Sequence, residues 1–195
     1  MRKGCTMSND VVPIEKAGEL QEPAPTAVNL FNAASPKEVV VKSAEVAKAL
    51  ADIILKQKLY TVISERKHVR VEGWTLCGSM LGVYPVCTWT RPIENGWEAR
   101  VEAKTMNGTI VGAAEASCLR TEKLWSSRDD FALRSMAQTR ATSRALRMPL
   151  GFIIQLAGYD ATPAEEAEGG NTLNQSAEVS ELNQAVKGKR DGKLI

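Results

Sequence analysis

Two glycine-containing turns separate three segments of alternating polar and apolar residues, and this pattern constrains the fold more than any other feature of the chain. The turns are Glu-Asn-Gly at 94–96 and Asn-Gly at 107–108, and the segments are 86–90, 97–104 and 109–118. Such turns favour tight hairpins between antiparallel strands, because Asn and Gly adopt positive φ readily. The pattern therefore predicts an antiparallel meander of three strands.

Charged and apolar residues alternate along the middle segment with the period of a strand. The charged set is Glu98, Arg100, Glu102 and Lys104, and the apolar set is Trp97, Ala99, Val101 and Ala103. A sheet of this kind exposes one face to water and packs the other on helices. We expect an α+β fold in which the meander packs on a helix.

That helix is predicted directly after the meander, over residues 128–147, with Ser127 as its N-cap. At about 100° per residue, Arg140, Arg144 and Arg147 lie on one side of it. Planar guanidinium groups suit phosphate, although a charge run on a helix is often a solvated face. We expect Pro149 to interrupt the end of the helix, and the apolar segment 150–157 to close the domain.

The first half of the chain adds two helices and two short strands. Ser-Pro-Lys-Glu at 35–38 has the pattern of a capping box, and the helix that it opens runs to about Gln57. Strands are expected at 59–63 and 68–71, followed by a short helix over 75–81. With the meander and the long helix, the predicted core has the order β-α-β-β-β-α.

The amino-acid composition of the two ends of the chain predicts where the folded domain begins and ends. Residues 1–34 are proline-containing without sustained periodicity, and residues 163–195 are rich in Glu, Gly, Asn, Gln and Ser. We expect a flexible N-terminal arm over 1–34, one folded domain over 35–162 and a disordered C-terminal tail over 163–195. Charge divides similarly, since residues 58–148 carry a net charge of +5 and residues 149–195 carry −3. A basic domain with an acidic tail is typical of a protein that binds anions.

No motif points to catalysis. The chain has no Gly-x-x-x-x-Gly-Lys and a single histidine, His68, which is expected to be a partly exposed strand residue. Asp129 and Asp130 suggest a helix start more than a magnesium site. We expect no cofactor, no metal and no enzymatic activity. Four separated cysteines, Cys5, Cys77, Cys87 and Cys118, are expected to be buried reduced thiols. With neither a secretory leader nor an apolar run of about eighteen residues, we expect a cytoplasmic protein that does not span a membrane.

A second basic cluster stands in the first half of the domain, at Arg66, Lys67 and Arg70. If the meander and the long helix pack together, this cluster and the three helix arginines line one groove. Such a groove binds a sugar-phosphate backbone by charge without reading its sequence. Trp74, Trp89 and Trp97 are either stacking surfaces for bases or core residues.

Three motifs in this order resemble the single-strand annealing proteins of the Rad-fifty-two type, a superfamily that includes the phage proteins Erf and Red-beta. Residues 66–74, Arg-Lys-His-Val-Arg-Val-Glu-Gly-Trp, resemble the family's strand with its Glu-Gly turn. Residues 79–82, Ser-Met-Leu-Gly, resemble the end of its short helix, and residues 141–151 resemble its closing helix with an Arg-Ala-Leu-Arg stretch. The resemblance covers about residues 55–152.

The resemblance implies an oligomeric ring or filament that binds single-stranded DNA and anneals it to a complementary strand without ATP, in recombination and repair. By motif position, Arg144 and Arg147 match the helix residues thought to contact phosphates, and Lys67 matches a basic strand residue. Ser143 stands where the family commonly has a further basic residue. The resemblance fits a phage or bacterial protein, and the tail is a candidate contact for a single-strand binding protein or a nuclease.

Two other functions remain open. The same basic surface suits a protein that coats single strands, or a structural phage protein, without promoting pairing. A small enzyme with a site around His68, Asp129 and Asp130 is the third alternative, although no nucleophile and base stand at a recognisable spacing.

Overall fold

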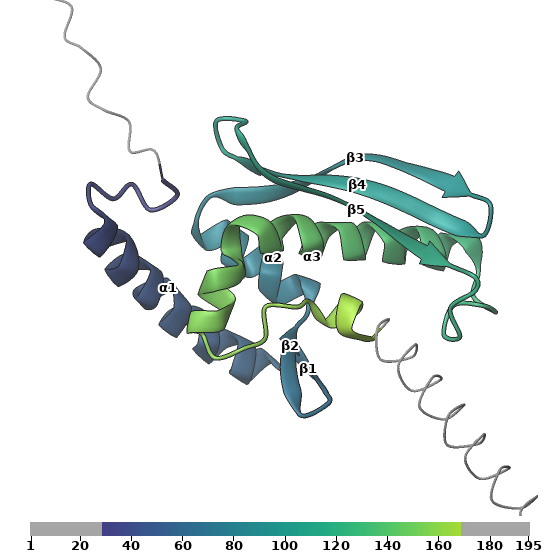
Figure 1. The fold of residues 1–195 in the computed structure, drawn as a ribbon, viewed down its shortest axis with the longest axis horizontal. Helices are drawn as coiled ribbons and strands as arrows, with labels where there is room; N and C mark the ends of the chain where they lie inside the picture. Colours follow the sequence, from purple (N-terminus) through teal and green to yellow (C-terminus); the bar gives the residue numbers. More distant parts are fainter. Residues whose placement is uncertain (1–28, 169–195) are drawn as a thin grey trace, which may run out of the picture.

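The computed structural model describes residues 29–168 and has an α+β fold (Figure 1). The fold class predicted from the sequence is confirmed, including the antiparallel meander and the long helix after it. The predicted arm and tail lie mostly outside the described residues. The elements, in chain order, are α1 (Pro36–Gln57), β1 (Tyr60–Ile63), β2 (Arg66–Val69), α2 (Val71–Met80), β3 (Val83–Ile93), β4 (Gly96–Thr105), β5 (Ile110–Leu119) and α3 (Asp130–Leu156).

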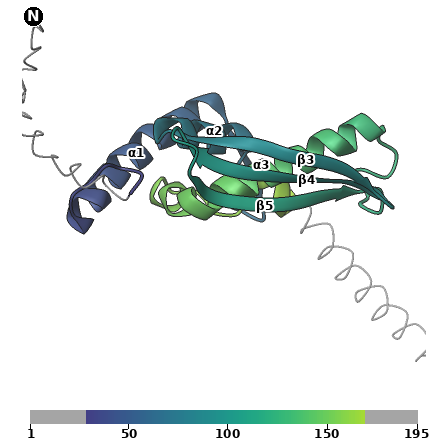
Figure 2. The same cartoon turned by 90° about the horizontal axis from the view of Figure 1, so that it is seen from above.

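The meander β3-β4-β5 forms one layer, and α3 runs beneath it (Figures 1 and 2). Ala99, Val101 and Ala103 on β4 are at most 1% exposed and form the face that packs on α3. The charged residues of β4 lie on the other face, where Glu98 pairs with Arg91 of β3. The predicted division into a wet face and a packed face is confirmed, because alternate residues of a strand point to opposite sides of a sheet.

Helix α3 is longer than the sequence pattern predicts. It continues through Pro149 to Leu156, so the expectation that Pro149 interrupts the end of the helix was wrong. Proline removes the N–H that would bond the carbonyl of Ala145. At this point β5 comes close, since a Cβ on Gly112 would lie 2.5 Å from the Ala145 oxygen and 2.9 Å from Pro149 Cδ. The missing side chain of Gly112 therefore lets β5 pack directly against the proline turn.

Two helices begin at other residues than the sequence pattern predicts. The N-cap of α3 is Asp129 rather than Ser127, and α2 begins at Val71 rather than near residue 75. The Glu-Gly pair at 72–73 lies inside the first turn of α2, where a Cβ on Gly73 would meet Val69 Cγ1 at 2.4 Å. The start of α1 is as predicted, because Ser35 Oγ accepts a hydrogen bond from the Glu38 amide at 3.3 Å.

On the other side of α3 from the sheet lie α1, α2 and the β1-β2 hairpin (Figure 1). The hairpin pairs Tyr60 with Val69 and turns at Ser64 and Glu65, both of which have positive φ. The core between the layers includes Trp74 of α2 and Leu146, Leu150 and Ile153 of α3, all fully buried.

The folded domain extends further at both ends than the predicted bounds of 35 and 162. Residues 29–34 pack on the fold, with Ala33 only 5% exposed, and Leu30 and Phe31 contact the core. Pro163 and Ala164 are buried, and residues 164–168 form a short helix. Within residues 29–168, no helix is both long and apolar enough to cross a membrane.

Candidate nucleic-acid interface

The three arginines predicted to form one stripe have different environments. Arg140 is the most enclosed, with a side chain that is 12% exposed. Its Nη1 donates to Glu122 Oε1 at 2.8 Å and to the Ser117 carbonyl at 2.9 Å, and its Nη2 donates to Glu122 Oε2 at 2.6 Å. Arg140 therefore joins α3 to the edge strand β5 and to the loop after it. Of the three arginines, Arg144 and Arg147 are the ones with more exposed side chains.

Arg144 and Arg147 lie one turn apart and hold the same carboxylate. Arg144 Nε donates to Glu166 Oε1, and Arg147 Nη1 donates to Glu166 Oε2 at 3.0 Å. Arg144 also donates to the carbonyl of Glu115 at 3.1 Å. The two arginine side chains remain 47% and 43% exposed, whereas that of Glu166 is 14% exposed. We call Arg144 and Arg147 the arginine pair.

The second predicted cluster, Arg66, Lys67 and Arg70, lies on and just after β2, and its three side chains are exposed. We call it the β2 cluster. Arg66 Nη1 is 3.4 Å from Asp160 Oδ2, and Arg70 Nε donates to Thr61 Oγ1 at 3.1 Å. The ammonium of Lys67 lies 5.4 Å from the centre of the Tyr60 ring. The Arg66 side chain is 75% exposed.

Residues 160–168, which we call the return segment, lie between the two basic clusters. The segment follows α3 and runs between that helix and the β1-β2 hairpin (Figure 1). The amide of Asp160 donates to the Lys67 carbonyl at 2.9 Å, and His68 Nδ1 lies 2.9 Å from the Thr162 carbonyl oxygen. Both clusters therefore flank the return segment, and it occupies the space of the groove that the sequence analysis predicted between them.

Two carboxyl groups of the return segment have shifted pKa values. The amide of Thr162 donates to Asp160 Oδ1 at 2.8 Å, and this hydrogen bond, with the nearby His68 and Arg66, holds the pKa of Asp160 below its usual value. Burial raises the pKa of Glu165, although its Oε1 accepts from the Val71 amide at 2.8 Å. Glu165 Oε2 is buried without a hydrogen-bond partner. The carboxylate of Glu165 is thus held at the start of α2 at an energetic cost.

Sequence reasoning identified the basic residues but missed their acidic partners, Glu122, Asp160 and Glu166. One signal was available, because residues 160–168 contain four acidic residues and no basic ones. This acidic stretch is complementary in charge to the basic domain, but the sequence does not indicate which arginine each acidic residue contacts.

The tryptophans divide between core and surface. Trp74 is fully buried and donates from Nε1 to the Val69 carbonyl at 3.1 Å. The guanidinium of Arg91 lies 4.4 Å from the centre of the Trp89 ring, and that of Arg134 lies 5.5 Å from the centre of the Trp97 ring. Trp74 is a core residue, and Trp97 is half-buried and packs against the core. Trp89 is half-buried, and it and Trp97 each lie within cation–π distance of an arginine.

The residues considered for an enzyme site do not come together. His68 is 6% exposed, rather than partly exposed as predicted, and its ring bonds the return segment. Asp129 occupies the N-cap position of α3 without a side-chain capping hydrogen bond, and Asp130 pairs with Arg120. Within the part of the chain that the structure describes, no group of three His, Cys, Asp or Glu side chains is placed to hold a metal ion.

The cysteines differ from one another in burial. Cys77 and Cys118 are buried, as predicted, and burial raises the pKa of their thiols to about 12 and about 11. Cys87 lies on β3 and is exposed, so the prediction of a buried thiol was wrong there. Cys5 lies outside the described residues.

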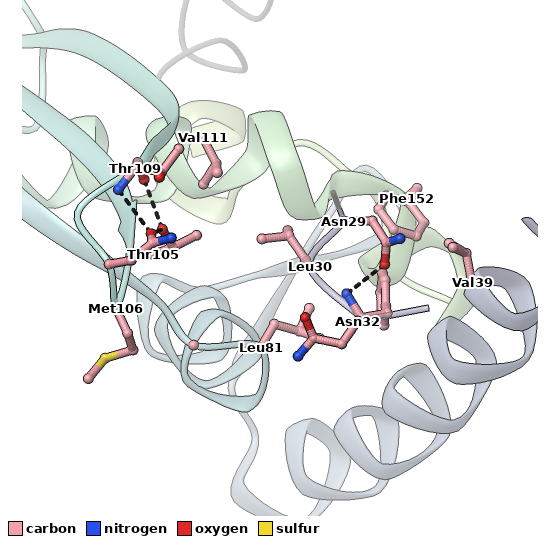
Figure 3. Close-up of a pocket in the computed structure, with 13 residues that line it drawn as sticks. Asn29, Leu30, Asn32, Val39, Leu81, Thr105, Met106, Thr109, Val111 and Phe152 are labelled. Atoms are coloured by element: carbon pink, nitrogen blue, oxygen red, sulfur yellow. Dashed lines mark hydrogen bonds between the residues drawn. The ribbon is translucent and has the colours of Figure 1, made fainter. Parts of the chain in front are cut away.

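A pocket of about 850 Å³ lies between residues 29–32, the start of α1, the end of α2 and the β4-β5 turn (Figure 3). Leu30, Val39 and Phe152 line one side of it, and Thr105 and Met106 line the other. Its lining includes no charged side chain. The pocket is therefore unsuited to phosphate and does not extend the basic surface.

Comparisons with protein-family models, with curated proteins and with solved structures found no match for this chain.

Proposed function

We propose that this protein binds single-stranded DNA through a basic surface made of the arginine pair and the β2 cluster, and that it promotes annealing of complementary strands without ATP. The observation that supports this function best is the way in which Arg144 and Arg147 share Glu166, each donating to a different carboxylate oxygen. A phosphodiester also presents two anionic oxygens. Two guanidinium groups that converge on one oxyanion have the geometry that phosphate binding requires.

The location of the pair on one rigid helix supports backbone binding rather than base reading. Arg144 and Arg147 are neighbours at spacing i, i+3 on α3, and Arg144 is held further by the carbonyl of Glu115. Contacts to phosphate position a strand and leave its base edges free. Annealing needs this property, because a protein that bonded the bases would compete with the incoming strand.

The β2 cluster widens the surface. Arg66, Lys67 and Arg70 are exposed, and the return segment lies between them and the arginine pair. A single domain of this size contacts few nucleotides, so a ring or filament of copies would raise the affinity through effective concentration. This assembly forms part of the proposal, as the resemblance of residues 55–152 to annealing proteins suggests.

Binding is tested by fluorescence anisotropy with a labelled oligonucleotide across a series of salt concentrations. The double variant Arg144→Ala/Arg147→Ala should bind all sequences more weakly, and its salt slope should fall by about 0.7 for each phosphate that the variant no longer neutralises. The matched control is Lys48→Ala/Lys56→Ala, which removes the same charge from exposed positions on α1. Equal weakening in the two double variants would mean that net charge alone drives binding. No binding by the wild-type protein at low salt would refute the function.

Annealing is tested separately with two complementary labelled strands in the absence of ATP. Accelerated pairing supports annealing, whereas suppressed pairing indicates a protein that only coats single strands. Particle images with and without single-stranded DNA then test for a ring or filament.

A further inference from the structure

The return segment resembles an anionic ligand in its charge and position. It contains four acidic residues and no basic one over positions 160–168, and three of the acids contact the basic surface or the start of α2. Its path leads from β2, across the first turn of α2, to the arginine pair on α3. The chain therefore places its own carboxylates where the proposed function places phosphates.

The segment is anchored more firmly at its start than at its end. Near the start, Asp160 forms a parallel bridge with His68 of β2, and Pro163 and Ala164 are buried. Beyond them, Glu166 is held by two half-exposed arginines. Ion pairs with exposed partners contribute little in water, because solvent and salt compete with them. Residues 165–168, which we call the tip, are held by these ion pairs and by the hydrogen bond from the Val71 amide to Glu165, and they have the weaker attachment because no residue of the tip is fully buried.

The tip also includes a group that is in an unfavourable environment. Glu165 has a buried oxygen without a partner, and burial raises the pKa of this carboxyl. Moving the tip away from α2 and α3 would break the hydrogen bond from the Val71 amide to Glu165 Oε1, but it would return that carboxylate to water. Release of the tip thus has a compensating gain, and the buried residues before it can stay in place.

We propose that the tip is an internal competitor for DNA, in which Glu166 occupies the arginine pair until a backbone phosphate displaces it. This inference rests on the proposed function, and it concerns regulation of the same site. The measured affinity of the full chain is then lower than that of the open surface by the fraction of molecules whose tip is released. Removal of the Glu166 charge raises the affinity, by about tenfold if the tip occupies the site for roughly nine-tenths of the time.

The competition also changes the salt dependence. When DNA binds the full chain, the arginine pair exchanges the Glu166 carboxylate for a backbone phosphate. The released carboxylate then attracts counterions from solution. Without the Glu166 charge, the same arginines bind phosphate from an unpaired state, and more counterions are released overall. The salt slope of Glu166→Gln is therefore expected to be steeper than that of the wild-type protein, a difference that a purely structural role of Glu166 would not produce.

The experiment measures oligonucleotide anisotropy for the wild type, Glu166→Gln and the control Glu94→Gln across a salt series. Glu94 lies exposed in the β3-β4 turn, and its replacement removes the same single charge. A second comparison introduces Glu166→Gln into the Arg144→Ala/Arg147→Ala background, where it should have no effect on affinity, because its partners are gone. Far-ultraviolet circular dichroism establishes that each variant is folded.

The outcomes separate the two proposals. Higher affinity and a steeper slope for Glu166→Gln, with Glu94→Gln unchanged, support the internal competitor. If the wild type binds and Glu166→Gln binds equally or more weakly, the competitor is overturned and the proposed function stands. Equal gains in Glu166→Gln and Glu94→Gln also overturn it, since general charge then explains the gain. If none of the three proteins binds at low salt, the proposed function fails, and the competitor fails with it.

Discussion

Arg140 and Glu122 form a two-point ion pair, with hydrogen bonds of 2.8 Å to Oε1 and 2.6 Å to Oε2, between the middle of α3 and the loop that follows β5. The Arg140 side chain is 12% exposed and that of Glu122 is 26% exposed. The same guanidinium bonds the Ser117 carbonyl on the edge strand. An arginine that the sequence places in a binding stripe is thus part of the packing between helix and sheet.

Replacing Arg140 with Ala should destabilise the fold by about 2–4 kcal/mol, because it leaves the Glu122 carboxylate and the Ser117 carbonyl without their shared donor. Replacing Arg144 with Ala should cost less than about 1 kcal/mol, since its ion pair is exposed. Urea unfolding followed by circular dichroism compares the two variants. Equal costs would contradict a structural role that is specific to Arg140.

The Glu122 pair also predicts a dependence of stability on pH. Burial by itself raises the pKa of Glu122, but hydrogen bonds from Arg140 and the Leu119 amide outweigh it and hold the pKa below the usual value of 4.5. The pair therefore stabilises the fold fully above pH 4.5 and loses this contribution as the pH falls through the lowered pKa. The free energy of unfolding of Glu122→Gln should be lower than that of the wild type at neutral pH and approach it in acid. A difference that stays constant from neutral to acidic pH would refute this account.

Gly112 and Gly151 offer a contrast in packing at the proline turn of α3. An alanine at 112 would place Cβ 2.5 Å from the Ala145 carbonyl oxygen, whereas one at 151 would meet only Arg147 Cγ, at 3.7 Å. Gly112→Ala should destabilise the fold by about 3 kcal/mol through overpacking. Gly151→Ala should stabilise it by about 0.5–1 kcal/mol, because Ala is the better helix former. Thermal unfolding of both variants checks the two predictions. An unchanged melting temperature for Gly112→Ala would mean that β5 does not approach α3 so closely.

The cysteines should differ in reactivity. Cys87 is exposed on β3, whereas burial raises the pKa of Cys77 to about 12 and that of Cys118 to about 11. In a Cys5→Ser variant, iodoacetamide should modify Cys87 in native buffer and reach the other two thiols only after unfolding. Mass spectrometry of the digested protein locates the label. Rapid native labelling of Cys77 or Cys118 would show that the core opens readily.

Local pattern was sufficient for most of the architecture. The alternation in β4, the turns around it and the capping box at Ser35 act between neighbouring residues, so the sequence alone predicts them. Errors occurred where distant segments decide the outcome. Gly112 of β5 packs closely on the helix turn that contains Pro149, and Cys87 is exposed beside the register shift that separates it from Trp89 in the β3-β4 pairing.

By itself, the sequence determined that this chain forms an antiparallel meander followed by a long helix with arginines on one side, because periodicity and turn chemistry are local. Only the tertiary structure decided what each arginine does. Arg140 meets Glu122 across 18 residues, whereas Arg144 and Arg147 meet Glu166 across 22 and 19. No pattern along the chain encodes these pairings, because they depend on how the loop after β5 and the return segment pack against α3. On the same helix face, Arg140 therefore has a structural role. In our proposal, Arg144 and Arg147 form an anion site that the acidic return segment covers.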